Sequence, residues 1–230
     1  MNIVISSGHG KYVRGAAGYL DEVDEARKVV ETIANNLHTA GVGVKTFHDN
    51  TSHSQNENLN TIVNYHNSQK RDLDVSVHFN AYNTTSKPMG TEVLYVSQSS
   101  LASKTSAAIA SAGAFINRGA KKRTDLFFLN STHEPAILIE TCFVDSSVDA
   151  ELYHNHYESI CRAIAEAIGG TEVPIAPEPP DTGEPEPPPD HVAEQHVEIT
   201  ISAPPGVIVN VTQVTTGDEA SRRHMKTASG

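Results

Sequence analysis

Apolar runs alternate with amphipathic segments along residues 1–170, and this alternation predicts the elements and their order. Short continuous apolar runs are typical of strands that are covered on both faces. Apolar residues that recur at spacings of three and four positions indicate helices with one buried face. We therefore expect strands over residues 2–6, 42–47, 91–97 and 136–139, and one more that ends at His78. Residues 126–129 are expected to form a short strand or an extended piece. Helices are expected over about 21–40, 55–67, 99–116 and 147–168, and residues 117–123 are interpreted as a basic loop.

The order of these elements predicts an α/β fold for residues 1–170. Because strands and helices alternate, the sheet should be twisted, largely parallel, built of about six strands and flanked by helices on both faces. Residues 171–190 should form an acidic, extended linker, since the stretch 173–190 contains eight prolines. In residues 191–230, two apolar runs on either side of a Pro-Pro-Gly turn predict a hairpin, which is marginal by itself. We expect this small β-type segment to self-associate, to pair with a partner or to be a fragment of a larger module.

Charge and composition narrow the classes of function. The net charge is −11, and the stretch 172–190 contributes six acids and no base. The lack of a basic patch argues against nucleic-acid binding, and the acidity argues against electrostatic attraction to an anionic surface. No apolar run reaches about 18 residues, so we expect no membrane insertion. The two cysteines make no disulfide framework, and the chain enters a strand directly after Met1 without the features of a secretory signal.

Three of the expected strands deliver a chemically active residue at the carboxyl end. His9 follows the first strand, His78 ends the third, and Glu140 ends the last. That edge of an open α/β sheet is where sites are usually built. Two histidines and one carboxylate are a standard ligand set for a catalytic zinc, which keeps one position open. The third ligand should come from the acidic cluster at 21–25, with Glu22 at the helix start and Asp24 or Glu25 as alternatives.

The other chemistry-bearing residues have plain structural alternatives. Nine other histidines, His66 among them, are expected to lie at the surface or to cap an element. A buried carboxylate such as Glu140 requires a partner, and it can exchange protons during a metal-assisted hydrolysis or form a structural ion pair with Arg123 or Lys122. Cys142 lies two residues further on and is expected to face the same way, which permits a Cys-His hydrolase. No basic neighbour is evident that would lower the pKa of this thiol.

Four motifs in a fixed order carry a family resemblance over about residues 1–168. They are Ser7-Gly8-His9-Gly10, the acid at the first helix, Ser76-Val77-His78-Phe79-Asn80-Ala81, and Pro135-Ala136-Ile137-Leu138-Ile139-Glu140. In this order they resemble the zinc-dependent N-acetylmuramoyl-L-alanine amidases, the peptidoglycan hydrolases found as bacterial autolysins and phage endolysins. The resemblance implies a twisted sheet flanked by helices and cleavage of the amide between muramic acid and L-alanine.

The resemblance also implies roles for individual residues. His9, Glu22 and His78 would hold Zn²⁺, Glu140 would be the catalytic acid and base, and Asn80 and Asn130 would support the substrate or the ligands. Residues 10–20 lack the Asp-Pro-Gly step common in the family, and Glu25 stays open as the third ligand. Glu22 is preferred because the apolar face of the helix then falls where the family helix packs.

A catalytic domain, a proline-rich linker and a small C-terminal segment are the architecture of phage endolysins. The resemblance therefore implies a protein that acts on bacterial peptidoglycan after staying in the host cytoplasm until release. The C-terminal segment would bind the cell wall or oligomerise. Two alternatives remain: a zinc peptidase that cuts within the stem peptide, and a non-catalytic α/β module that binds the cell wall.

Overall fold

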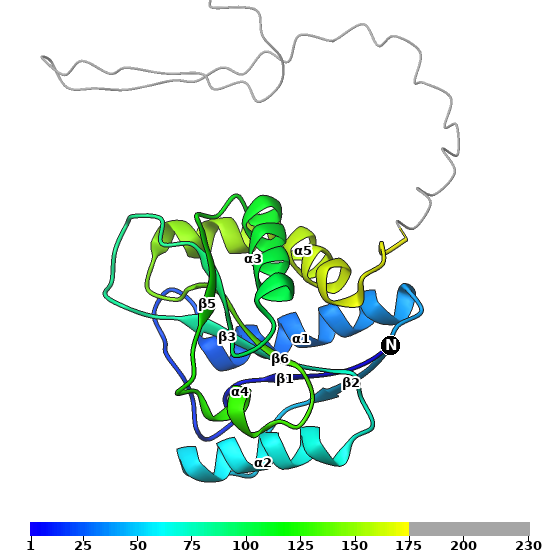
Figure 1. Ribbon diagram of the computed structural model, residues 1–230. Coiled ribbons are helices and arrows are strands. Elements are labelled where there is room, and N and C mark those ends of the chain that lie inside the picture. The colour runs from blue at the N-terminus through cyan, green and yellow to red at the C-terminus, as the bar shows by residue number, and fades with distance from the viewer. Residues whose placement is uncertain (175–230) are drawn as a thin grey trace, which may run out of the picture. The chain divides into compact units, whose positions relative to one another are not determined.

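The computed structural model describes residues 1–174, which form a six-stranded sheet covered by helices on both faces (Figure 1). This confirms the predicted α/β class and the number of strands. The C-terminal segment predicted at 191–230, and residues 175–190 of the predicted linker, lie outside the described residues. No helix within residues 1–174 combines the length and the apolar character needed to cross a membrane.

The elements follow one another as six strands and five helices. The strands are β1 (Asn2–Ser7), β2 (Gly43–Phe47), β3 (Leu73–Asn80), β4 (Thr91–Tyr95), β5 (Asn117–Lys122) and β6 (Ala136–Phe143). The helices are α1 (Glu22–Thr39), α2 (Gln55–Ser68), α3 (Ser99–Gly113), α4 (Phe127–Ser131) and α5 (Ser147–Gly169). The strand order is β2-β1-β3-β6-β4-β5, in which β1, β2, β3 and β6 are parallel. Strand β4 runs antiparallel to β6, and β5 runs parallel to β4.

Two expected elements differ from the structure, and both lie near the β5 edge of the sheet. Residues 117–122 are the edge strand β5 and not a loop. The strand could not be predicted from an apolar run, because its side chains are largely basic. An edge strand that faces solvent needs no apolar run, and charges on it prevent pairing with other chains. Residues 127–131 form the short helix α4 and not a strand. An apolar run of four residues does not distinguish a strand from one buried helical turn.

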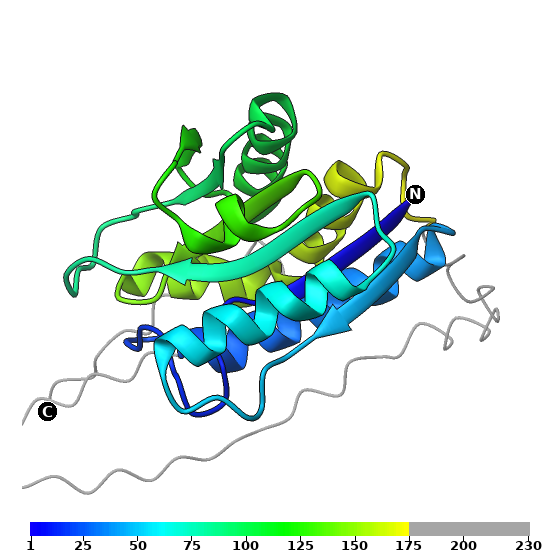
Figure 2. The ribbon, with the colours of Figure 1, turned by 60° about the horizontal axis from the view of Figure 1, so that its bottom comes forward.

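The two faces of the sheet differ in chemistry. One face packs an apolar core against α1, α3 and α5, to which the central strands contribute Ile3, Ile5, Val75, Val77, Ile137 and Ile139. The opposite face lies under α2 and α4 and has a much smaller apolar cluster. Figure 2 shows α2, in cyan, lying along the strands on this second face. The strand positions that point to it are largely polar, and they hold both a buried network and the candidate site.

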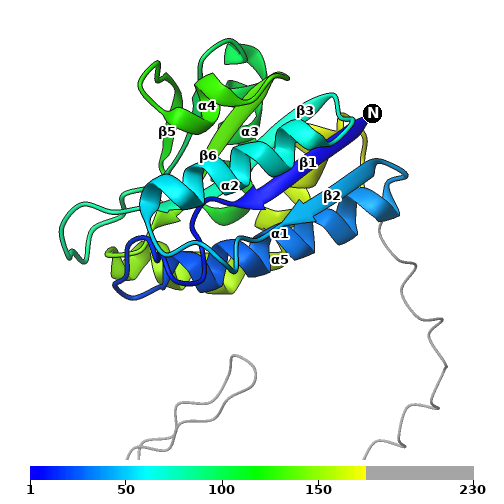
Figure 3. The ribbon, with the colours of Figure 1, turned by 90° about the horizontal axis from the view of Figure 1, so that it is seen from below.

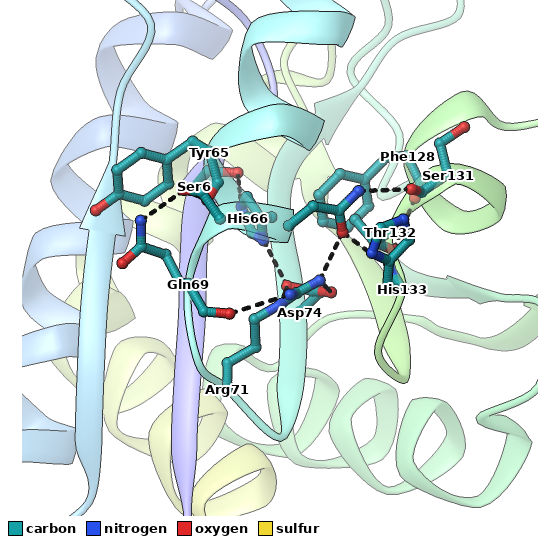
Figure 4. A network of polar contacts seen from close by, with 12 residues as sticks. Ser6, Tyr65, His66, Gln69, Arg71, Asp74, Phe128, Ser131, Thr132 and His133 are labelled. Carbon is teal, nitrogen blue, oxygen red and sulfur yellow. Dashed lines mark hydrogen bonds and ion pairs between the residues drawn. The ribbon is translucent and has the colours of Figure 1, made fainter.

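The buried network is centred on Asp74 at the start of β3 (Figure 4). His66, on α2, contacts Asp74 Oδ1 through Nδ1 at 2.7 Å and Ser6 Oγ through Nε2 at 3.0 Å. Arg71 donates to both carboxylate oxygens of Asp74, at 2.7 and 2.8 Å. His66 is therefore fully buried, and the expectation of a surface or capping role for it was wrong. Burial lowers the pKa of His66, because the protonated ring would be desolvated there.

The same network extends to the segment that follows α4. Asn67 accepts from Arg71 Nη2 at 2.7 Å and from the backbone N–H of His133 at 2.9 Å, and its Nδ2 donates to the carbonyl of Ser131 at 2.9 Å. Strand β3, helix α2 and the α4 segment are thus connected by polar contacts. This connection positions the two helices that cover the polar face.

We expect the Asp74→Ala substitution to destabilise the protein by about 3–5 kcal/mol, because it leaves the buried Arg71 guanidinium and His66 without their common acceptor. Urea unfolding at pH 7 measures this change. The matched control is Asp72→Ala, since Asp72 is exposed and accepts one hydrogen bond from the Asn2 backbone. That variant should lose no more than about 1.5 kcal/mol. Equal losses in the two variants would show that the buried network does not stabilise this face.

Candidate active site

Four candidate residues meet at the carboxyl ends of the parallel strands. Figure 3 shows that the loops following β1 and β3 leave the sheet at the same end. His9 follows β1, His78 lies in β3, and Glu140 lies in β6 directly opposite His78. Glu22 is the first residue of α1 and reaches the same place from the other side of the sheet. The ligand atoms of His9, Glu22 and His78 all lie within 4.8 Å of one another.

The Glu22 carboxylate is the centre of this group. Its Oε1 lies 3.0 Å from His78 Nδ1 and 3.3 Å from His9 Nε2, and it accepts the backbone N–H of Phe79 at 3.2 Å. Its Oε2 accepts the backbone N–H of Ala16 at 2.8 Å. Burial by itself would raise the pKa of Glu22. The hydrogen bonds from the two histidines outweigh that effect and hold the pKa well below its usual range.

Two glycines make room for these side chains. A Cβ on Gly8 would lie 1.8 Å from His78 Nε2, and a Cβ on Gly15 would lie 2.0 Å from Glu22 Oε2. Neither position therefore tolerates a side chain while the site keeps this geometry. The loop between β1 and α1, which contains these glycines, passes close to the protein's own candidate ligands, and this close approach explains why it is rich in glycine.

The other acids of the 21–25 cluster point elsewhere. Asp21 caps α1 by accepting from the N–H groups of residues 23 and 24, and Asp24 pairs with Arg14. Glu25 accepts from Lys28 at 2.7 Å and from the Tyr153 hydroxyl of α5 at 2.9 Å. The structure therefore places Glu22, and neither Asp24 nor Glu25, beside the two imidazoles.

The three residues fit a zinc ion. Zinc binds imidazole and carboxylate at about 2.0–2.2 Å in a tetrahedral arrangement, which places neighbouring ligand atoms about 3.3 Å apart. The distances of 3.0 and 3.3 Å from Glu22 to the two histidines match that spacing. One ligand atom from each of the three residues lies within 4.8 Å of the other two, so the three atoms are close enough to bind one ion.

Glu140 lies beside this cluster on the central strand β6. It is flanked by His78 on β3 and by Glu92 on β4. Its Oε2 is buried and has no hydrogen-bond partner among residues 1–174. Burial, together with the negative charges of Glu22 and Glu92, raises the pKa of Glu140 well above its usual range. A carboxyl group beside a candidate metal site is the type of side chain that serves as a general acid and base in hydrolysis.

Glu92 is a neighbour of the site that pattern reasoning missed. It accepts from Arg118 at 2.6 Å and from Lys121 at 2.5 Å, both on β5, and from the Asn80 side-chain amide at 3.2 Å. Burial would raise the pKa of Glu92, but these two cations lower it, so this carboxylate stays charged beside Glu140. An acid inside the otherwise apolar run of β4 was the available signal. Asn80 thus lies next to the site, hydrogen-bonded to one of its carboxylates.

The predicted alternatives for Glu140 and Cys142 do not match the structure. Arg123 pairs with Asp125 and not with Glu140, through hydrogen bonds of 2.8 and 2.7 Å. The pairing of β3 with β6 shifts register after His78, and Cys142 packs into the apolar core. The expectation that Cys142 faces the same way as Glu140 was therefore wrong. Burial raises the pKa of this thiol, which makes it a poor nucleophile.

Asn130 stabilises the loop that precedes it in the chain. Its side-chain amide donates to the carbonyls of Thr124 at 3.1 Å and Leu126 at 2.7 Å. Asn130 is not among the residues that line the cavity beside the site. The structure thus does not bring it together with the other candidate residues.

A cavity of about 440 Å³ opens beside the cluster, between the polar face of the sheet and helices α2 and α4. His9, His78 and Glu140 line one part of it. Apolar side chains of α2 and α4 line another, among them Leu59 and Phe128. A cavity of this size is in the range of small-ligand sites, and it combines an apolar wall with a few convergent polar groups.

Residues 3–169 match the family model described as N-acetylmuramoyl-L-alanine amidase. Two proteins from Clostridium perfringens, both described as uncharacterized, are similar in sequence. One is 31% identical over 158 residues, which are 66% of this chain and 46% of the relative. The other, from strain 13 / Type A, is 30% identical over 179 residues, which are 75% of this chain and 53% of the relative. The matches thus span about half the length of each curated relative.

Solved structures with the same fold include an endolysin domain and a bacterial amidase. The catalytic domain of the CD27L endolysin, which targets Clostridia difficile, has a TM-score of 0.69 and 28% identity, covering 76% of this chain and 99% of that domain. The CwlD amidase from Clostridioides difficile, solved with the GerS lipoprotein, has a TM-score of 0.66 and 22% identity, covering 74% of this chain and 96% of that chain. The similarity to the CwlD amidase concerns the fold alone.

We expect the Gly8→Ala substitution to weaken zinc binding by about 10- to 100-fold, because the new methyl group displaces the His78 ring. Competition with a chromophoric chelator measures the affinity. The control is Gly41→Ala, at a position with φ of +73° where a Cβ meets nothing within 4 Å. That change strains the backbone by about 1–2 kcal/mol but should leave zinc affinity unaltered. Wild-type affinity in the Gly8 variant would contradict the proposed position of His78 among the ligands.

Proposed function

The chain belongs to the N-acetylmuramoyl-L-alanine amidase family, and from this premise we propose that it is a zinc-dependent hydrolase of bacterial peptidoglycan. The bond cleaved is the amide between N-acetylmuramic acid and L-alanine. The observation that carries the proposal is the juxtaposition of a two-histidine, one-carboxylate cluster with the partly buried Glu140. In this proposal His9, Glu22 and His78 hold Zn²⁺, and Glu140 transfers the proton.

The proposed chemistry divides between the metal and the protein. When bound, Zn²⁺ supplies Lewis-acid polarisation of the scissile carbonyl. Glu140 accepts a proton from the attacking water as the new C–O bond forms, and it donates that proton to the alanine nitrogen as the C–N bond breaks. Its Oε2, which has no partner among residues 1–174, is available for this exchange. Asn80 supports this region through its hydrogen bond to Glu92.

We further propose that the protein acts as a phage endolysin, held in the host cytoplasm until it is released to the cell wall. The support is the similarity to the catalytic domain of an endolysin at 28% identity. A bacterial autolysin is the second candidate, because the family resemblance covers autolysins and endolysins alike. Fractionation of producing cells before and during lysis separates the two. An endolysin should stay in the soluble fraction until lysis begins, whereas an autolysin should accumulate at the wall in intact growing cells.

We expect Glu140→Gln to retain zinc and to lose peptidoglycan hydrolysis by about 10²- to 10⁴-fold, since the amide cannot accept the proton. Metal analysis and a wall-lysis assay measure the two effects. Mass analysis of wild-type digests should show a free lactyl carboxyl group on muramic acid and a new L-alanine N-terminus. A cut within the stem peptide would favour the zinc peptidase alternative. Normal lysis by Glu140→Gln would remove Glu140 from the mechanism.

Zinc should stabilise the folded domain. At a free concentration 100 times its dissociation constant, the ion adds about 2.7 kcal/mol. For a domain of this size, that corresponds to an increase of roughly 5–10 °C in Tm. A chelator should reverse the shift, His78→Ala should abolish it, and Glu140→Gln should keep it. A zinc-induced increase in Tm that persists in His78→Ala would place the metal elsewhere in the protein. Differential scanning calorimetry makes the comparison.

A further inference from the structure

Arg123 is the one lysine or arginine among the described residues that line the catalytic cavity. It follows directly after β5 and lies on the cavity lining with Asp125 and the apolar residues of α4. Glu140 and the two candidate histidine ligands line the same cavity. Apart from the two histidines, the rest of the lining consists of carboxylates, neutral polar side chains and apolar side chains. Arg123 is therefore the side chain there that is suited to bind a negatively charged group of a ligand at a distance from the metal ligands.

The Arg123 side chain is oriented by Asp125, and only some of its N–H donors take part in that pairing. Its Nε and Nη2 donate to the two oxygens of Asp125, at 2.8 and 2.7 Å. A guanidinium has five N–H donors, so this arrangement leaves the Nη1 edge, with the second hydrogen of Nη2, for another acceptor pair. The side chains of Arg123 and Asp125 are 44% and 65% exposed. Exposed ion pairs contribute little to stability, so a structural role explains the pair poorly.

The loop that presents Arg123 is held at both ends. The backbone N–H of Arg123 donates to the carbonyl of Tyr95 at 2.9 Å, which attaches it to the end of β4. The Asn130 side chain donates to the carbonyls of Thr124 and Leu126 and so fixes the turn that follows. Asn130 therefore acts as a positioning residue for this loop. An arginine held in this way loses little side-chain entropy on binding, as bidentate recognition requires.

We propose that Arg123 binds a free carboxylate on the second residue of the stem peptide, and that the enzyme thereby prefers peptidoglycan in which this group is not amidated. The inference rests on the proposed amidase function. On the sugar side, the muramic acid carboxyl is already consumed in the scissile amide, so a nearby anionic group must come from the peptide. Two extended residues span about 7 Å, which a cavity of about 440 Å³ can accommodate. The alanine methyl group would contact the apolar α4 wall.

A carboxamide at the same position would bind poorly. Its NH₂ group is a donor and would face the donors of the guanidinium, and the charge that strengthens the hydrogen bonds would be lost. A site built around such a pair rejects the analogue that lacks it. We expect the wild-type enzyme to favour the free carboxylate by about 10- to 100-fold in kcat/KM.

The test uses two soluble muramoyl-peptide fragments with complete stems that differ only in a carboxylate or a carboxamide on the second residue. Arg123→Gln should lower kcat/KM for the carboxylate fragment by about 10- to 100-fold and leave the carboxamide fragment nearly unaffected. Arg123→Lys should retain part of the preference, because lysine keeps the charge but not the fork. The matched control is Lys122→Gln, which removes an exposed positive charge one residue away and should keep the wild-type preference.

Binding measured without turnover separates recognition from chemistry. In a Glu140→Gln background, the carboxylate fragment should bind more tightly than the carboxamide fragment, and the added Arg123→Gln change should remove the difference. Equal cleavage of the two fragments by the wild type, or equal losses on both in Arg123→Gln, would overturn the assignment of Arg123. If the wild type released the stem peptide, with L-alanine at its N-terminus, from neither fragment, the amidase function itself would fail. Should Arg123→Gln not fold, Arg123→Lys and Asp125→Asn, each with a reduced preference, carry the same test.

Discussion

The buried carboxylate of Glu22 is the interaction on which the site depends. A charged group removed from water is costly unless it is paired and hydrogen-bonded. Glu22 meets this demand with groups from two separate parts of the chain: His9 and the Ala16 amide in the loop between β1 and α1, and His78 and the Phe79 amide in β3. The same contacts fix the loop, the start of α1 and the end of β3 relative to one another. The array that solvates the charge is therefore also the array that can hold a metal ion.

The two faces of the sheet differ in chemistry, and the apolar face offsets the free-energy cost of burying polar groups on the other. The face under α1, α3 and α5 holds most of the apolar core and hence most of the hydrophobic stabilisation. The other face can then carry polar residues on every central strand. Asp74, His66 and Arg71 form its buried anchor, and Asn67 extends that anchor to the segment behind α4. The cavity walls formed by α2 and α4 are thus attached to the sheet by polar contacts and not by a large apolar interface.

The antiparallel addition of β4 and β5 adds a second set of charges around Glu140. Glu92 enters from β4, and its cations Arg118 and Lys121 enter from β5. The chain then turns at Arg123 toward the cavity and continues into α4. This part of the molecule therefore surrounds Glu140, to which we assign proton transfer, with fixed charge, and it also presents Arg123, to which we assign substrate selection. The parallel part of the sheet positions the candidate ligands His9 and His78, and the antiparallel part supplies the charges around Glu140.

Local pattern alone determined much of this protein. Continuous apolar runs identified the central strands and so placed His9, His78 and Glu140 at one edge of a sheet, because buried parallel strands must be apolar on both faces. Long-range contacts decided the rest. Glu22 and Glu25 share one helix turn, but Glu25 pairs with Lys28 and with Tyr153, the latter more than a hundred residues away, and so it does not join the site. A register shift turned Cys142 into the core, and pairing with β4 made a strand of residues 117–122. The periodicity of apolar residues reports how an element is buried. The neighbours of that element are set only when the chain packs. Those neighbours decide which acid lies in the site, which way a thiol faces and which segment becomes an edge strand.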